Sequence, residues 1–426
     1  MQISELKSDI ILDENTKYFD YTASALALKS IELKMQNILK TYANTHSDSA
    51  KNSKITSKYY KDAKSYIKKS LGLNSNYSLI ACGSGSTAAI KKFQELLGIY
   101  VPPLIKQRYF NDIAKNTLPL VIVSAIEHHS NELSFKEGLC ECIRLNHRDF
   151  NSDLYELERI CKKNANRKII MSFNAVSNIT GVRANLVKIS EIAKKYKAIL
   201  AIDASSAIPY ENIEIPFDAL FFSGHKMLGG VGTSGFLAIK NELIGKIPTF
   251  AAGGTVGYVS RSNYEFLDDA ESLEEGGTPA ILQVIKSELA FRLRDEIGLG
   301  VIKEKENILK EYFLNAIKKV QFKYKIILYA ANIKDRLPIF SLNSTGVSPY
   351  DLARVLSDDY EIETRAGCAC AGPYAHDLLN YVDNQNFNAK PGFLRISLHY
   401  THELSDIDYL INALCKSIEK LNKNLK

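Results

Sequence analysis

Between residues 77 and 222, short apolar runs rich in β-branched and aromatic residues alternate with amphipathic helical stretches, and this alternation constrains the fold most. Such runs are typical of buried strands, and the helices between them predict an α/β domain with a mostly parallel central sheet. The expected strands are 77–82, 120–126, 139–145, 168–174, 198–202 and 219–222, with helices at 87–97 and 186–196. Ligands of such sheets bind beyond the carboxyl ends of the strands.

The pattern changes after about residue 285. A long helical stretch from Leu282 past Leu309 precedes isolated strands at 338–342 and 393–398, and Ser405 is the expected cap of a closing helix. We therefore expect a large domain of residues 26–285, and a smaller α+β domain of residues 1–25 with 286–426. The segment 99–118 fits neither pattern.

Composition excludes several classes of protein. The net charge is only +6 and the lysines are scattered along helical stretches, which predicts a solvated surface and no nucleic-acid partner. No apolar run reaches membrane-spanning length and no signal peptide is recognisable, so no membrane association is expected. Seven cysteines, an odd number, indicate reduced thiols and a cytoplasmic location.

A lysine follows the last of these expected strands. The strand at 219–222 leads into Ser223-Gly-His-Lys226 and then into Gly229, Gly230 and Gly232. An amine held where a buried strand meets a glycine-rich turn loses water, so its pKa falls and it can act as a nucleophile. This is the setting of a Schiff-base lysine, although an ordinary surface lysine after a strand fits the same pattern.

Other polar residues follow other expected strands. Cys82-Gly-Ser-Gly-Ser-Thr87 offers hydroxyls and a helix N-terminus to a phosphate, but it equally fits an ordinary capped turn. His128, Asn178 and Asp203 each follow a strand of their own. A phosphate cradle, a stacking imidazole, a carboxylate for a ring nitrogen and a reactive lysine together make the parts of a pyridoxal 5′-phosphate (PLP) site.

On these residues the chain resembles the class V aminotransferase-fold PLP enzymes, and among them the cysteine desulfurases and selenocysteine lyases. The resemblance runs from about Tyr18 to the last helix. Its motifs are Tyr18-Phe-Asp-Tyr-Thr-Ala-Ser24, Glu127-His-His-Ser-Asn131, Val176-Ser-Asn178, Asp203, Ser223-Gly-His-Lys226, Glu275-Gly-Gly-Thr-Pro279, Arg365-Ala-Gly-Cys-Ala-Cys-Ala371 and Leu394-Arg-Ile-Ser397.

The resemblance implies the PLP-dependent transferase fold type I, a homodimer, and a role for each site residue. Lys226 would bond the cofactor, His128 would stack on its ring, and Asp203 would meet the ring nitrogen. Asn178 would lie by the phenolic oxygen, and Arg395 would take the substrate carboxylate, with Arg365 and Asn178 as further substrate contacts. The phosphate ligands would be Ser86, Thr87, Ser223 and His225, with Thr278 facing the phosphate of the other subunit.

The chain departs from many relatives at two places. Ser206 stands where they carry Gln or His beside the cofactor, and it is too short for the same contact. The cysteine loop reads Gly367-Cys-Ala-Cys-Ala371, in which Cys370 matches the family nucleophile and Cys368 is additional. Flanking glycines predict a mobile or exposed turn there, whose thiolate can attack a substrate sulfur.

These features predict a cysteine desulfurase that converts L-cysteine to L-alanine, with a persulfide on Cys370 passed to an acceptor protein for iron–sulfur cluster or other sulfur chemistry. The catalytic residues would be Lys226, Cys370 and His128, with no metal. An aminotransferase, epimerase or carbon–sulfur or carbon–nitrogen lyase in which Cys370 is idle remains an alternative. A zinc or thiol protein is another, because Cys140-Glu-Cys142 and Cys368-Ala-Cys370 form two Cys-x-Cys pairs.

Overall fold

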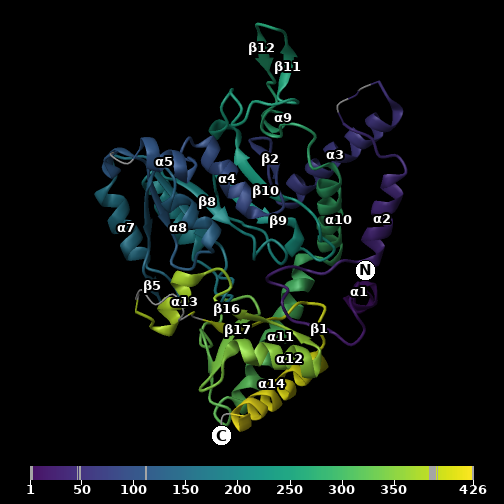
Figure 1. Cartoon of the computed structure of the whole chain (residues 1–426), viewed down its shortest axis with the longest axis vertical. Coiled ribbons are helices and arrows are strands. Elements are labelled where there is room, and N and C mark those ends of the chain that lie inside the picture. The colour runs from purple at the N-terminus through teal and green to yellow at the C-terminus, as the bar shows by residue number, and fades with distance from the viewer. Residues whose placement is uncertain are drawn as a thin grey trace.

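The computed structural model describes residues 3–45, 47, 49–110, 113–382, 390 and 392–424. Its centre is a seven-stranded sheet (Figure 1). The strand order is β2 (Tyr77–Cys82), β10 (Gly235–Lys240), β9 (Ala219–Ser223), β8 (Ile199–Asp203), β7 (Ile169–Asn174), β3 (Leu120–Val123) and β4 (Glu141–Arg144). Only β10 is antiparallel to its neighbours, so the predicted mostly parallel α/β sheet is confirmed. The sequence analysis did not predict β10.

Apolar side chains along each strand alternate between two clusters, so both faces of the sheet are buried. Ile170 and Phe221 belong to one apolar cluster, whereas their neighbours Met171 and Phe222 belong to another. Successive side chains of a strand point to opposite faces, so each face needs its own cover of helices. Phe93 of α4 (Ser86–Leu96) packs in the first cluster. The second holds side chains of α2 (Lys29–Leu39), α3 (Lys51–Ser70), α7 (Leu154–Lys163), α8 (Leu186–Lys195) and α10 (Ile281–Ile297).

A smaller, antiparallel sheet lies below the first one in Figure 1. Its order is β13 (Ile326–Leu328), β14 (Ile339–Ser344), β17 (Phe393–Ser397) and β16 (Arg365–Gly367), and it packs against α11 (Leu299–Val320), α12 (Pro349–Tyr360) and α14 (Leu404–Asn424). The helix expected from Leu282 past Leu309 is in fact two, because Gly298 adopts a positive φ of 88° between α10 and α11. Ser405 lies inside α14 and is not its cap. The proposed division into domains 26–285 and 1–25 with 286–426 stays a prediction, and its residues 1–2, 46, 48, 111–112, 383–389, 391 and 425–426 lie outside the described residues.

The N-terminal arm crosses to the smaller sheet. After α1 (Ile3–Asp9), β1 (Lys17–Tyr18) pairs in parallel with β15 (Ile362–Glu363), and Asp20 forms a bridge with Ser397 at the end of β17. These pairings fix the backbone of Asp20 between β15 and β17.

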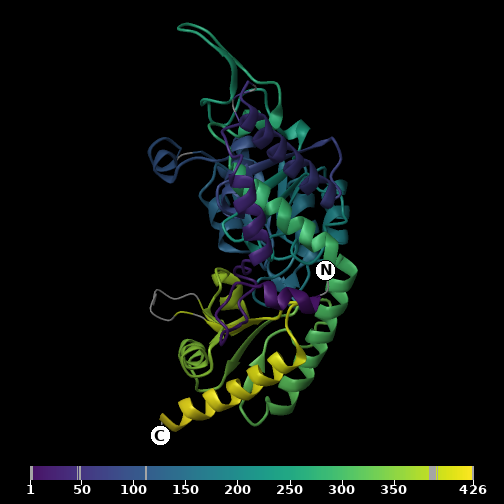
Figure 2. The same cartoon turned by 90° about the vertical axis from the view of Figure 1, so that its right-hand side faces the viewer.

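The remaining elements are peripheral. The hairpin of β11 (Val256–Val259) and β12 (Tyr264–Phe266) projects at the end opposite the smaller sheet (Figures 1 and 2). The segment that fitted neither pattern contains the short helix α5 (Pro103–Tyr109), which begins at a proline. The others are α6 (Leu133–Lys136), α9 (Ala270–Glu274), α13 (Gly372–Leu379), β5 (His147–Arg148) and β6 (Asn151–Ser152). Among the described residues, no helix is both long and apolar enough to cross a membrane.

Candidate active site

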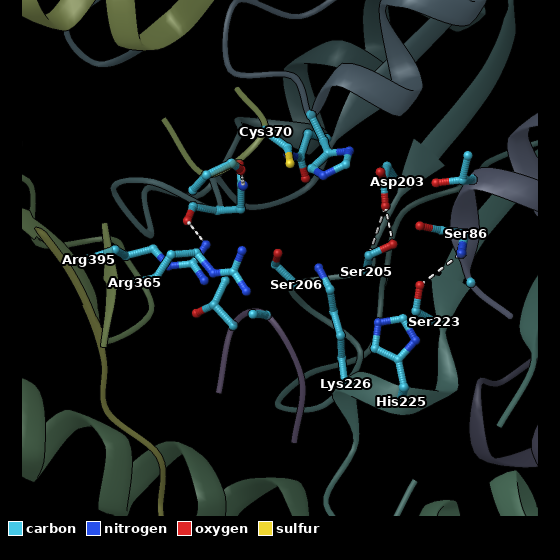
Figure 3. Close-up of a pocket in the computed structure, with 18 residues that line it drawn as sticks. Ser86, Asp203, Ser205, Ser206, Ser223, His225, Lys226, Arg365, Cys370 and Arg395 are labelled. Atoms are coloured by element: carbon cyan, nitrogen blue, oxygen red, sulfur yellow. Dashed lines mark hydrogen bonds between the residues drawn. The ribbon is translucent and has the colours of Figure 1, made fainter. Parts of the chain in front are cut away.

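A cavity of about 210 Å³ opens at the carboxyl ends of β7, β8 and β9, where the N-terminus of α4 meets β16, β17 and the N-terminal arm. Lys226 points into this cavity, with Arg365 and Arg395 on one side of it and Asp203 on the other (Figure 3). Of the predicted site residues, twelve line this cavity: Ser86, Thr87, His128, Asn178, Asp203, Ser206, Ser223, His225, Lys226, Arg365, Cys370 and Arg395.

Lys226 ends a single 3-10 turn, Gly224–Lys226, directly after β9. Burial lowers the pKa of Lys226 to about 8, and the nearby Arg395 and Arg365 push it in the same direction. Asp203 opposes this shift because its negative charge favours the ammonium form. A substantial fraction of the amine is therefore neutral near physiological pH and can act as a nucleophile or a base.

Asp203 ends β8 and is only 3% exposed. Its Oδ1 accepts hydrogen bonds from the Ser205 backbone N–H at 3.0 Å and from the Ser205 hydroxyl at 2.5 Å. These bonds fix the carboxylate plane at the cavity wall. Ser205 was not singled out from the sequence. Ser206, its neighbour, is buried in the same wall.

His128 presents a defined tautomer to the cavity. Its Nδ1 accepts a hydrogen bond from the Ser130 N–H at 3.2 Å, so in the neutral ring the proton sits on Nε2. Burial lowers the pKa of His128 to about 4, and the charge of Lys226 adds to this effect. At neutral pH the ring is therefore uncharged and can donate a hydrogen bond from Nε2, but that nitrogen cannot accept one.

The glycine turn before α4 forms a tight cradle. The Ser86 N–H at the helix N-terminus donates to the Ser223 hydroxyl at 2.8 Å, and the Thr87 and Ser130 hydroxyls lie 2.7 Å apart. A Cβ on Gly85 would come within 3.3 Å of His225 Cε1, so only glycine leaves this space open. Hydroxyls and a free helix N-terminus make this end of the cavity suitable for a phosphate group.

A pair of arginines forms the opposite wall, and Asp20 holds both. Asp20 Oδ1 accepts from Arg395 Nη2 at 2.6 Å, and Oδ2 accepts from Arg365 Nε at 3.0 Å. Arg395 is 3% exposed, and its Nη1 also donates to the Asn178 carbonyl at 3.1 Å. The pair suits a substrate carboxylate. Asp20 was quoted in the sequence motif at residues 18–24 but received no role, because the contacts that reveal it join distant parts of the chain.

Cys370 lies in the loop between β16 and α13 at the rim of the cavity, and it is exposed as expected. Cysteines from the two Cys-x-Cys pairs noted in the sequence pack in different apolar clusters. Cys140 and Cys142 pack in the apolar cluster around α4, whereas Cys368 packs against the cluster around Tyr374. The residues that the structure describes contain no group of three His, Cys, Asp or Glu side chains placed to bind a metal ion.

Thr278 does not line the cavity. It is exposed, and its hydroxyl accepts a hydrogen bond from Asn44 Nδ2 at 3.0 Å. A contact between Thr278 and a cofactor would therefore have to be made in another subunit.

Comparison with known proteins gives the family. The family model for class-V aminotransferases matches residues 17–410. The chain belongs to this family. A probable cysteine desulfurase of Pyrococcus abyssi is 25% identical over all of this chain and 99% of its own length, and one of Borreliella burgdorferi is 29% identical over 71% of each chain. The structure also resembles that of a cysteine desulfurase from Thermococcus onnurineus, with a TM-score of 0.82, 25% identity and 99% of each chain covered.

Class-V aminotransferases of this kind work with PLP, and PLP is accordingly the cofactor of this chain. The residues that line the cavity also suit PLP, independently of the comparison. It combines a phosphate cradle that a Cβ at Gly85 would fill, a buried carboxylate at Asp203 and an amine of lowered pKa at Lys226. Asn178 Oδ1 is buried, and no described residue gives it a hydrogen bond, so it can accept one from a bound group.

Proposed function

We propose that this protein is a PLP-dependent cysteine desulfurase that forms L-alanine from L-cysteine and leaves a persulfide on Cys370. One observation carries this proposal: an exposed thiol stands at the rim of the cavity that also holds Lys226 and the arginine pair. An amino-acid carboxylate bound at the arginines would thus lie in the same cavity as the amine and below the thiol. The relatives that match over most of this chain carry the names cysteine desulfurase or probable cysteine desulfurase.

Each residue has a task in this chemistry. PLP, when bound, supplies an electron sink for the pair of electrons left when the substrate Cα loses its proton. Arg395 and Arg365 bind and orient the substrate carboxylate, and Asp203 provides the negative charge that keeps the ring nitrogen protonated. Lys226 bonds the cofactor between turnovers and moves the Cα proton. His128 offers the hydrogen-bond donor that its tautomer presents to the cavity.

The sulfur step balances without an external oxidant. The Cys370 thiolate attacks the substrate sulfur, so that an S–S bond forms while the substrate C–S bond breaks. The substrate Cβ gains a proton and is reduced, and the two sulfur atoms are left as a persulfide. Cysteine and one enzyme thiol therefore give alanine and one enzyme persulfide, and Lys226, which lines the same cavity, can carry the proton.

The test compares two serine variants in the same loop. Cys370→Ser should abolish alanine and sulfide formation from L-cysteine while the visible absorption of the bound cofactor stays. Cys368→Ser is the matched control and should keep the activity. Full sulfide turnover by Cys370→Ser would refute the role of Cys370, and formation of a keto acid only with an amino acceptor would identify an aminotransferase instead.

Assembly and location belong to the same proposal. We propose a homodimer, because Thr278 is exposed away from its own cavity and the hairpin carries exposed Tyr258, Val259 and Tyr264. The persulfide would pass to an acceptor protein, for iron–sulfur cluster or other sulfur chemistry. A cytoplasmic location is supported by the seven cysteines, all of which are free thiols. Sedimentation at micromolar concentration tests the dimer, and a monomer would refute it.

A further inference from the structure

The loop that carries Cys370 has a strained backbone. Ala369 and Cys370 have positive φ angles of 47° and 58°, although neither is glycine. Side chains with a Cβ disfavour this left-handed conformation, and two such residues in succession persist only where the surroundings hold them. The loop was expected to be mobile or exposed. Cys370 is exposed, and the contacts around it show what holds its backbone.

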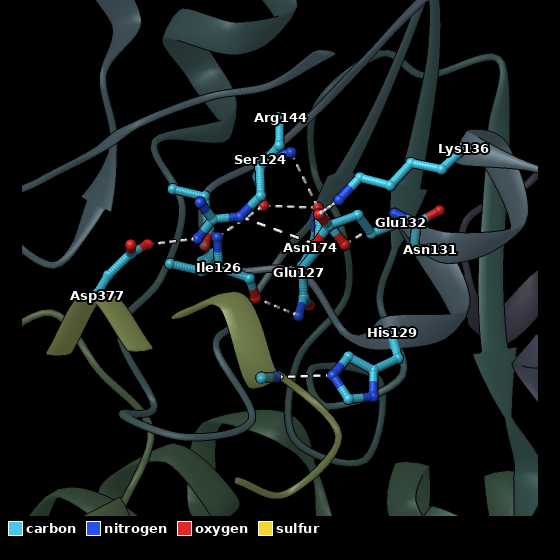
Figure 4. A network of polar contacts seen from close by, with 12 residues as sticks. Ser124, Ile126, Glu127, His129, Asn131, Glu132, Lys136, Arg144, Asn174 and Asp377 are labelled. Atoms are coloured by element: carbon cyan, nitrogen blue, oxygen red, sulfur yellow. Dashed lines mark hydrogen bonds and ion pairs between the residues drawn. The ribbon is translucent and has the colours of Figure 1, made fainter. Parts of the chain in front are cut away.

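Two hydrogen bonds of His129 enclose the residue pair Cys370–Ala371. The His129 backbone N–H donates to the Cys370 carbonyl at 2.7 Å. Its ring Nε2 accepts from the Gly372 N–H, also at 2.7 Å, and Figure 4 shows this bond as the dashed line at the His129 ring. A third bond comes from Asn178, whose Nδ2 donates to the Ala369 carbonyl at 2.6 Å. All three bonds come from the part of the chain that carries the central sheet, and each is short enough to be well formed.

His129 itself stands on a rigid support. It begins the 3-10 turn His129–Asn131, and Asn131 is buried with its Nδ2 donating to Glu127 Oε2 at 2.9 Å. Glu127 Oε1 in turn accepts from the Ser124 hydroxyl at 2.6 Å and from the Asn174 N–H at 2.7 Å. The 3-10 turn that carries His129 is therefore fixed against the ends of β3 and β7, and the bond from its ring to Gly372 links the loop to that support.

The far side of the loop is fixed separately. Asp377 of α13 pairs with Arg144 at 2.5 Å, and Arg144 also donates to the Ala125 carbonyl at 2.7 Å. Tyr374 and Ala375 of the same helix pack against Ile126 and Ile179. Ala371 is buried, its N–H donates to the Cys368 carbonyl, and its carbonyl accepts from the Ala375 N–H, each at 2.9 Å. Ala369 and Cys370 are therefore the residues whose carbonyls depend on the bonds from Asn178 and His129.

We propose that His129 is the positioning residue of the Cys370 loop, holding the thiol at the cavity rim through its neutral imidazole. The proposal rests on the proposed function only in taking Cys370 as the sulfur acceptor. As an acceptor at Nε2, the neutral ring carries its proton on Nδ1, the tautomer opposite to that of His128. A doubly protonated ring would face the Gly372 N–H with another N–H, and the bond would be lost.

The surroundings of the ring favour its neutral form. Burial lowers the pKa of His129, Glu132 on the following turn raises it, and Lys136 of α6 lowers it again. The neighbouring ring of His128 lies 6.4 Å away between centroids. Across from the ring, the loop places the Gly372 backbone N–H against Nε2.

Hydrogen exchange tests the proposal without reference to sulfur chemistry. In the PLP-loaded protein, His129→Ala should speed exchange of the Gly372 amide by roughly two- to tenfold, the range expected for one lost hydrogen bond. His129→Gln places an amide oxygen near the position of Nε2 and should restore much of the protection. Equal exchange of the 368–373 peptide in wild type and His129→Ala would overturn the proposal.

Two further measurements complete the design. Sulfide formation by His129→Ala should show a lower kcat with little change in KM, because the arginine pair that binds the carboxylate is untouched, and His129→Gln should recover activity. Should His129→Ala fail to fold, nitrogen NMR of the wild-type imidazole decides: a proton on Nδ1 supports the proposal, and one on Nε2 overturns it. If His129→Ala speeds exchange in the loop but the wild-type protein has no desulfurase activity, the proposed function is refuted and the role of His129 in positioning the loop stands.

Discussion

The lowered pKa of Lys226 gives a quantitative prediction. An ordinary lysine side chain has a pKa of 10.5, whereas burial brings that of Lys226 to about 8. The difference between these two values makes the neutral amine at pH 7 roughly 300-fold more abundant than in an unperturbed lysine. The rate at which the Lys226 amine reacts with an electrophile should rise with pH and level off above about pH 8.

The assay follows that amine directly in protein freed of cofactor. Brief labelling with an amine-reactive acylating reagent across a pH series, read by mass spectrometry of the peptide that contains Lys226, gives the midpoint. Lys58, whose side chain is 79% exposed, reports the intrinsic reactivity of the reagent in the same digest. Asp203→Asn should lower the midpoint further, because the Asp203 charge favours the ammonium form. A midpoint near that of an ordinary lysine, or a rise in Asp203→Asn, would refute the reasoning.

Two other substitutions and one titration probe the cradle, the arginine pair and the His128 imidazole. Gly85→Ala puts a methyl group 3.3 Å from the His225 ring, so PLP affinity measured by fluorescence titration should fall roughly tenfold, whereas Gly253→Ala, which meets open space, should not change it. Asp20→Ala leaves the buried Arg395 charge without its carboxylate and should cost about 3–5 kcal/mol in urea unfolding. Adding Arg395→Met should recover part of that loss, and a double variant no more stable than the single one would contradict the pairing. The ring C–H protons of His128 should show a titration midpoint near pH 4 in proton NMR, and a midpoint above pH 6 would show that the ring is not held neutral by burial.

The central sheet was predictable because its strands are local patterns. The run 169–174, for example, is buried on both faces, and its apolar part ends at the polar Asn174. β10 escaped notice because it follows the glycines at 229–232 and reads as the continuation of their turn. The break at Gly298 was missed for a similar reason, since hydrophobic spacing continues across it and only the positive φ separates the two helices.

The site was predictable to the extent that its residues follow strands. Lys226, Asp203 and Asn178 come together because parallel strands end at one edge of the sheet. Asp20 and His129 act through partners that are 375 and 243 residues away, and no local pattern marks such contacts. The roles given to individual residues, including Thr278, stay predictions.

The pairing of Asp20 with Arg395 also bears on how the protein is made. The carboxylate leaves the ribosome first, and its guanidinium partner follows 375 residues later. Until then the arm can pair with β15 but not with β17, and the wall that would receive an amino acid lacks Arg395. A nascent chain therefore cannot assemble this wall before Arg395 has been synthesised, so the site cannot bind its substrate until the smaller sheet has formed.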